Sequence, residues 1–118
     1  MQVMVSAWPF LSKRSDNRAA LEQNHWAMTL QGTSNPVAWD DNNCVGSGGG
    51  PCAIYDPTQK SARGFIWSRL KEGYYKYGIK IFWLDGSEPE ISTSGAWDAS
   101  KFYNNSLGLG QQNGMMYP

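Results

Sequence analysis

The pattern of hydrophobic and polar positions predicts two short strands in the first third of the chain. Residues 1–8 partly alternate between apolar and polar side chains and include β-branched residues, which is typical of a buried strand, and Pro9 ends it. Residues 26–30 are a second strand candidate, closed by the turn-forming residues 32–36. The chain is therefore expected to enter its fold directly as a strand.

One short helix is predicted near each end of the chain. Residues 17–24 have an apolar centre, and Ser15 or Asp16 can accept hydrogen bonds from the free N–H groups of the first turn. Residues 96–107 form a second candidate, which is either one helix capped by Ser94 or a helix that ends early at Asn104 and Asn105.

The clearest helix signal follows Asp56 and Thr58, either of which can cap the first turn. Gly78 is expected to end this helix in a left-handed conformation. Its predicted inner face has the three-and-four spacing of a helix stripe and comprises Ala62, Phe65, Ile66, Arg69, Leu70, Gly73 and Tyr77. A long amphipathic helix therefore occupies the middle of the chain.

A nearly continuous apolar segment, residues 79–85, follows this helix. Such a strand after a helix is typical of a parallel sheet that is buried on both faces. The order of strands and helices indicates the α/β class.

Composition narrows the functional classes. The 118 residues carry 10 Lys and Arg against 10 Asp and Glu, so the formal charge is zero and a nucleic-acid partner is disfavoured. No apolar run approaches the ~20 residues of a membrane span. Six Trp, six Tyr and four Phe supply the large apolar area that the core requires.

The cysteines leave two alternatives open. Cys44 and Cys52 bracket a glycine-rich loop, and they either form a disulfide or remain two thiols. With His25 they match no zinc spacing, and Asp40 and Asn42 have no glycine at the offset of a calcium loop. We therefore expect no metal.

The candidate chemistry lies where the apolar segment ends. Asp85 ends the predicted strand beside Trp83, Gly86 allows a sharp exit, and Pro89 stiffens the loop. Ligands of parallel α/β folds bind at the carboxyl ends of the strands, so this carboxylate suits nucleophilic or acid/base chemistry on a sugar. In the alternative interpretation Asp85 only caps the following turn, and Glu88 is a surface acid like Glu90 two positions on.

Several collinear segments resemble glycoside hydrolase family 31, the α-glucosidase and α-xylosidase group. FWLDGSEPE resembles the nucleophile motif of this family. VMVSAWP resembles the preceding barrel strand of the family, and YDPTQKSARGFIW resembles the start of a helix. YYKYGIKIFWLD resembles the run from that helix into the next strand, and YNNSLGLGQQNGMMYP resembles the segment after the nucleophile.

The resemblance implies a role for individual residues. Asp85 matches the catalytic nucleophile, and Trp83 matches an aromatic residue that lines the sugar subsite. Trp8 either lines the site or packs in the core. Gly86 stands where many α-glucosidases of the family have methionine, which fits the α-xylosidase branch better. Supporting motif positions are Gly86, Glu88 and Pro89, while Asp56 and Arg63 match architectural positions, a helix cap and a helix-to-sheet contact.

The resemblance also implies an incomplete site. Residues 1–118 are expected to be a fragment of a catalytic TIM-barrel domain, a partial (β/α)8 barrel of two to three βα units that does not close alone. A retaining glycosidase needs two carboxyl groups about 5–5.5 Å apart. The family's acid/base motif is absent, and Asp98 resembles none. The parent is expected to be a retaining α-glycosidase that needs no cofactor, and this chain alone is expected to be inactive.

The expected partners are a glycoside substrate and the remainder of the barrel. A carbohydrate-binding module without chemistry is the main alternative, because the aromatic and amide side chains suit sugar binding, and it predicts mostly β structure. A decayed product without function is a third. The sequon at residues 104–106 and the two cysteines tilt toward a secretory route, but they do not fix the compartment.

Overall fold

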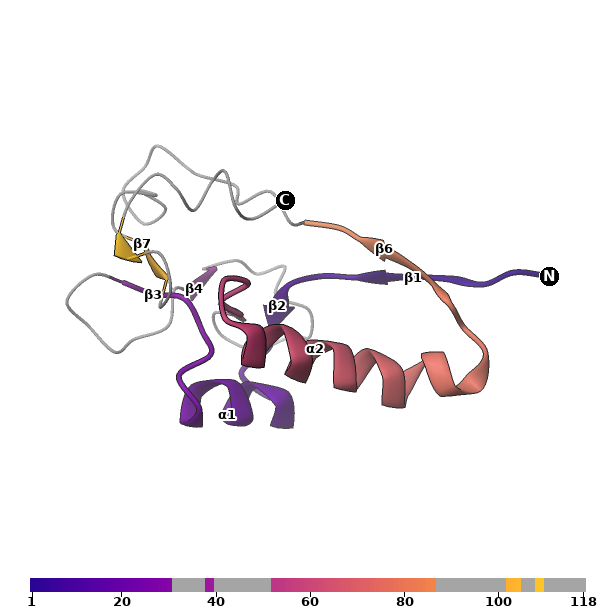
Figure 1. The fold of residues 1–118 in the computed structure, drawn as a ribbon, viewed down its shortest axis with the longest axis horizontal. Coiled ribbons are helices and arrows are strands. Elements are labelled where there is room, and N and C mark those ends of the chain that lie inside the picture. The colour runs from indigo at the N-terminus through magenta and orange to yellow at the C-terminus, as the bar shows by residue number, and fades with distance from the viewer. Residues whose placement is uncertain (31–37, 40–51, 87–101, 105–107, 110–118) are drawn as a thin grey trace.

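The computed structural model describes residues 1–30, 38–39, 52–86, 102–104 and 108–109, which form a mixed arrangement of helices and strands (Figure 1). In chain order the elements are β1 (Met4–Ala7), β2 (Phe10–Leu11), α1 (Asp16–Gln23), β3 (Thr29–Leu30), β4 (Ala38–Trp39), β5 (Cys52–Ile54), α2 (Lys60–Gly73), the 3₁₀ helix η1 (Tyr75–Tyr77), β6 (Ile81–Leu84), β7 (Phe102–Asn104) and β8 (Gly108–Leu109).

Strands β1 and β6 form a parallel pair, with Met4 opposite Ile81 and Ala7 opposite Leu84. A parallel pair needs a long crossover connection, and α2 is the last α-helix described in this connection before η1 and β6. Figure 1 shows α2 running along one side of the pair. The predicted parallel arrangement of the first strand and the apolar segment is therefore confirmed.

The prediction that the apolar segment is buried on both faces is wrong. Phe82 points toward the helix side, where its ring contacts those of Trp67 and Tyr74 at centroid distances of 6.1 and 6.4 Å. Ile81 is exposed, and 56% of Trp83 is exposed. The physical reason is that the sheet has only two strands and a helix on one face, so within the described residues nothing covers the other face.

The remaining strands form two small antiparallel sheets, ordered β2-β5-β4 and β3-β7-β8. The second predicted strand is shorter than expected, since Ala27 makes only an isolated bridge to Tyr55 before β3 begins. Cys52 in β5 is disulfide-bonded, which agrees with the first alternative, whereas Cys44, Asp40 and the turn at residues 32–36 lie outside the described residues.

The helix expected at residues 96–107 is wrong where the structure describes that segment. Phe102–Asn104 is strand β7, which pairs antiparallel with β3 and β8. Aromatic residues such as Phe102 and Tyr103 favour strands. Residues 102–104 form a strand because they pair with a strand that is distant in sequence. A local helix pattern contains no information about such pairing.

The first helix forms as expected, with bounds one residue earlier. The Ser15 hydroxyl accepts a hydrogen bond from the Asn17 N–H at 3.2 Å, so Ser15 is the cap. Arg18 is buried behind this turn. It donates to the Glu22 carboxylate at 2.6 Å and to the Leu11 carbonyl at 3.3 Å. A charged side chain thus joins α1 to the end of β2.

The start of α2 corrects the predicted cap. Asp56 is fully buried, and its Oδ1 accepts hydrogen bonds from the N–H and hydroxyl of Thr58, at 2.9 and 2.6 Å. These bonds form a local turn ahead of the helix, so the helix begins later, and its N-cap Gln59 makes no side-chain capping bond. Among the described residues, Arg63 makes no hydrogen bond to a strand and instead donates to the Pro57 carbonyl at 2.7 Å.

The end of α2 also differs from the prediction. The helix stops at Gly73, and the backbone of Tyr74 leaves the helical region with φ −136°. Gly78 is left-handed, with φ 93°, but it ends η1 and not α2. Tyr77 therefore falls in η1 and is exposed. Glycine followed by two tyrosines has low helix propensity, which explains the early stop.

A thin core joins α1 to the antiparallel strands. Its buried residues are Leu11, Leu21, Ala27 and Ala53, against which Trp26, Tyr55 and Ile66 pack. A mostly β module is disfavoured, because α2 spans 14 residues and the main strand pair is parallel. In the part of the chain that the structure describes, neither helix is long and apolar enough to cross a membrane.

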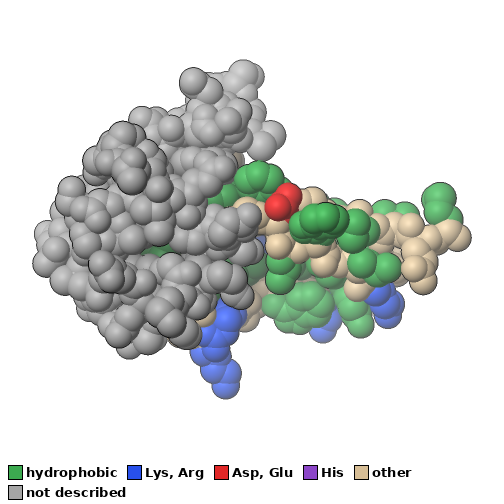
Figure 2. Space-filling model, turned by 90° about the horizontal axis from the view of Figure 1, so that it is seen from above, with side chains coloured by type: hydrophobic (Ala, Val, Ile, Leu, Met, Phe, Trp, Pro, Cys, Tyr) green, Lys and Arg blue, Asp and Glu red, His purple; other side chains and the backbone are tan. Residues whose placement is uncertain are grey.

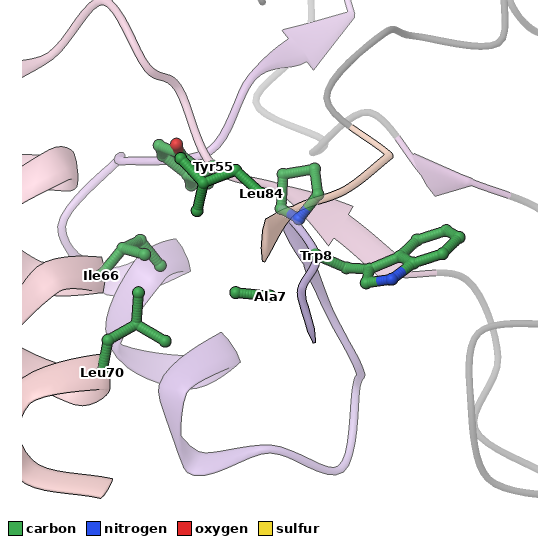
Figure 3. A pocket seen from close by; sticks show the side chains of 7 residues that line it. Ala7, Trp8, Tyr55, Ile66, Leu70 and Leu84 are labelled. Carbon is green, nitrogen blue, oxygen red and sulfur yellow. The ribbon is translucent and has the colours of Figure 1, made fainter. Parts of the chain in front are cut away.

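A small cavity of about 70 Å³ lies between α2 and the ends of β1 and β6 (Figure 3). Its lining is almost entirely apolar and comprises Ala7, Trp8, Pro9, Tyr55, Ile66, Leu70 and Leu84. Burial raises the pKa of the Tyr55 phenol above its ordinary value of 10.0, and the nearby Arg63 guanidinium offsets part of that rise. The cavity is much smaller than the ~300 Å³ at which ligand pockets begin.

Leu21 and Leu84 provide a matched test of where the core lies. Leu21 is fully buried, so Leu21→Ala is expected to lower the free energy of unfolding of the 118-residue chain by about 2–5 kcal/mol. Leu84 is 69% exposed, so Leu84→Ala is expected to cost under about 1 kcal/mol. Urea denaturation followed by tryptophan fluorescence measures both; equal losses would contradict the assigned core.

Tyr55 predicts a change of stability at alkaline pH. Because the pKa of Tyr55 is raised in the folded chain, unfolded chains release the phenolic proton first. The contribution to stability is complete below pH 10 and is lost as the pH rises through the folded pKa. Denaturation of the Tyr55→Phe variant between pH 9 and 12 is expected to show a shallower loss of stability. Identical pH dependence in both proteins would contradict this assignment.

Candidate active site

Asp85 directly follows β6, at the carboxyl end of the parallel pair. Its backbone N–H donates to the Ala7 carbonyl at 3.2 Å, which extends the pairing of β1 and β6 by one hydrogen bond. Its Oδ1 accepts a hydrogen bond from the Gly86 N–H at 2.9 Å, and the side chain is only partly exposed. This carboxylate therefore caps the next residue, as the alternative interpretation expected, and also stays at the edge where ligands bind.

The strand alternation places Trp83 on the same face as Asp85. Phe82 faces α2, so the residues on either side of it point the other way. In the parallel register Ser6 lies opposite Trp83. Figure 2 looks down on this side of the molecule. It shows hydrophobic side chains (green) gathered along it, with an acidic side chain (red) exposed beside them.

Trp8 stands at the end of β1, next to the same edge. Half of it is exposed, at 51%. Its indole N–H donates to the Ser6 hydroxyl at 3.2 Å, and its ring lies 5.9 Å from that of Phe10. Figure 3 shows the indole directed away from Ile66 and Leu70. The indole N–H of Trp8 is therefore held by Ser6, while half of the residue remains exposed.

Gly86 makes the sharp exit that its position predicts. Its φ is +64°, which side chains disfavour. A Cβ at this position would lie 2.8 Å from Cε3 of Trp8 and 3.3 Å from Cε2 of Phe10. Glycine is thus required both by its backbone conformation and by the two rings that press against it.

The structure brings together four of the predicted site residues, namely Asp85, Trp83, Trp8 and Gly86. Glu88, Pro89 and Asp98 lie outside the described residues. Sequence reasoning missed Ser6 and Phe10, which hold the Trp8 ring. The available signal was the period of two along β1, which places Ser6 and Trp8 on one side.

The other described acids lie elsewhere in the fold, with Asp16 in the first turn of α1. Glu22 pairs with Arg18, and Asp56 forms the turn before α2. Glu72 accepts a hydrogen bond from Lys76 at 2.9 Å, which lowers the pKa of Glu72. These carboxylates therefore serve local structure, and Asp85 is the described acid at the carboxyl end of the parallel pair.

Two further observations concern ligands. Among the described residues, no three His, Cys, Asp or Glu side chains are placed to hold a metal ion. A hollow of about 380 Å³ lies at the amino ends of β1 and β6, lined by residues 1–3 and 77–81. It is at the opposite end of the strands from Asp85, so it is separate from the candidate site.

Comparison with known proteins identifies a family that matches the chain. The family model described as "Glycosyl hydrolases family 31 TIM-barrel domain" matches residues 1–115. Alpha-xylosidase A of Aspergillus niger is 38% identical over 88 residues, which cover 74% of this chain and 11% of that protein. An uncharacterized family 31 glucosidase of Pseudescherichia vulneris is 33% identical over 91 residues, covering 76% and 16%.

A solved structure gives the same result. The crystal structure of a family 31 alpha-xylosidase from a soil metagenome, complexed with xylose, is 30% identical and superposes with a TM-score of 0.79. It covers 99% of this chain, and the chain covers 16% of that protein. The chain thus spans between a tenth and a sixth of the length of these relatives. The match across nearly its whole length shows that the chain belongs to glycoside hydrolase family 31, as part of its TIM-barrel domain.

Proposed function

We propose that this chain supplies the nucleophile, Asp85, of a retaining α-glycosidase. The observation that carries the proposal is the position of Asp85 at the carboxyl end of β6, on the open face that also carries Trp83. The chain would form two to three βα units of a (β/α)8 barrel. The remainder of that barrel would supply a second carboxylic acid, and residues 1–118 alone would be inactive.

The chemistry follows from two carboxyl groups. The Asp85 carboxylate attacks the anomeric carbon, and the bond to the leaving oxygen breaks as the second carboxylic acid protonates that oxygen. This step leaves a glycosyl ester on Asp85. The second group, now ionised, removes a proton from water, the water oxygen attacks the anomeric carbon, and the ester bond to Asp85 breaks. Two displacements retain the α configuration.

The local geometry suits the first step. The backbone of Asp85 is fixed by its hydrogen bond to Ala7, and Oδ1 is occupied by the Gly86 N–H. Within the described part of the chain, Oδ2 has no hydrogen-bond partner, so it is the oxygen that would attack. A fixed nucleophile removes much of the orientational cost of the reaction.

The substrate class is proposed as an α-xyloside, with an α-glucoside as the second choice. Support comes from two relatives that are named alpha-xylosidases, one of them complexed with xylose. Gly86 places no side chain beside Asp85, and the exposed ring of Trp83 offers an apolar surface for the sugar face.

The decisive variant is Asp85→Asn in the full-length protein. Loss of the nucleophile is expected to lower kcat on 4-nitrophenyl α-xyloside or α-glucoside by on the order of 10³-fold or more. Asp16→Asn, in the first turn of α1, is the matched control and should keep full turnover. Undiminished turnover by the Asp85 variant would refute the assignment. Peptide mass spectrometry after trapping with a fluorinated glycosyl fluoride should find the sugar on Asp85.

Trp83→Ala tests the sugar platform. Loss of a stacking surface is expected to weaken binding by about 1 kcal/mol, which raises KM and the inhibition constant of the free sugar roughly five-fold. The value of kcat should change less than KM. Unchanged affinity for free xylose and glucose would show that Trp83 does not contact the sugar.

A further inference from the structure

We propose that Trp8 is a positioning residue that holds the Asp85 carboxylate in its reactive orientation by acting through Gly86. The inference rests on the proposed role of Asp85. It concerns the aromatic ring that lies against the residue after the nucleophile, and it assigns this ring a task distinct from contacting the sugar.

The first step is the contact itself. A Cβ on Gly86 would lie 2.8 and 3.1 Å from Cε3 and Cζ3 of Trp8, and 3.3 Å from Cε2 of Phe10. Distances below 3.0 Å are not accessible to real Cβ atoms, so these rings occupy the space that any side chain at position 86 would need. The indole is therefore packed directly against the Gly86 backbone.

The second step links this backbone to the carboxylate. The N–H that Gly86 donates to Asp85 Oδ1, at 2.9 Å, belongs to the same residue that the rings confine. Glycine with φ +64° adopts negative φ values about as readily when nothing restrains it. Because the rings press on the Gly86 Cα, they also restrain the peptide plane between Asp85 and Gly86; without them this plane could rotate about ψ of Asp85, and the N–H in it would leave the carboxylate.

The third step explains why Trp8 can serve as a rigid support. Its indole N–H is anchored on the Ser6 hydroxyl at 3.2 Å, and its ring is braced by Phe10. The neighbouring carbonyl of Ala7 accepts the Asp85 N–H. A single segment at the end of β1 therefore fixes both the backbone of Asp85 and the amide that orients its side chain.

The catalytic consequence is a loss of rate with little loss of affinity. A displacement of about 1 Å at a reacting group can cost roughly 100-fold in rate. A ring that only stacks on the sugar would instead change the affinity for the free sugar. If Trp8 positions Asp85, its removal lowers kcat. If Trp8 only stacks on the sugar, its removal weakens binding of the free sugar.

The test uses the full-length protein and the better of 4-nitrophenyl α-xyloside and α-glucoside. Trp8→Ala is expected to lower kcat by about 10- to 100-fold, with the inhibition constant of the corresponding free sugar changed less than about two-fold. Trp8→Phe keeps an aromatic ring but loses the indole N–H that Ser6 accepts, so it should recover only part of kcat. Trp67→Ala removes an indole of similar exposure from α2 and should leave kcat unchanged.

A double-mutant cycle sharpens the test. Gly86→Ala alone should lower kcat, because the added Cβ displaces the Trp8 ring. In Trp8→Ala/Gly86→Ala the indole is already gone, so the part of the loss caused by its displacement should not recur, and the combined loss should be smaller than the product of the two single losses. Gly86→Ala removes no apolar contact, so it remains informative even where Trp8→Ala lowers the thermal unfolding temperature.

Three results would overturn the proposal. They are full kcat in Trp8→Ala, a rise in the inhibition constant at unchanged kcat, and independent losses that multiply in the double variant. These outcomes differ from failure of the proposed function, which is turnover by Asp85→Asn. If Asp85→Asn is inactive and Trp8→Ala is fully active, the positioning role of Trp8 is wrong and the proposed role of Asp85 stands.

Discussion

The parallel pairing of β1 with β6 is the interaction on which the rest of the candidate site depends. It brings the first strand beside a strand more than seventy residues later, and its last hydrogen bond joins the Asp85 N–H to the Ala7 carbonyl at 3.2 Å. Because parallel strands end at the same edge, Trp8 and Asp85 emerge side by side. A shift of one residue would turn Trp83 toward α2.

Helix α2 determines which face of this pair is open. The rings of Trp67 and Tyr74 meet Phe82 on one side, so that side is the outer, packed face. By alternation, Trp83 and Asp85 face the other way. Their exposure is the expected state of a strand pair whose inner face, in a barrel, would be covered by further strands.

Gly86, the residue after Asp85, is confined both by its backbone conformation and by its neighbours. The positive φ of Gly86 and the rings of Trp8 and Phe10 require a residue without a side chain, and the same residue directs its N–H at the Asp85 carboxylate. The position that departs from the α-glucosidase pattern is therefore also one at which a side chain has no room.

The sequence by itself determined the α/β class, a helix start capped by Ser15 or Asp16, the strand that leads to Asp85 and the family resemblance, because each depends on short-range pattern or motif. It could not determine that residues 102–104 form a strand, since that choice depends on pairing with β3. Nor could it show that Asp56 is consumed in a turn, or that Ser6 and Phe10 hold Trp8. Tertiary contacts between distant segments decided these features, because their free energy exceeds the small differences in local propensity.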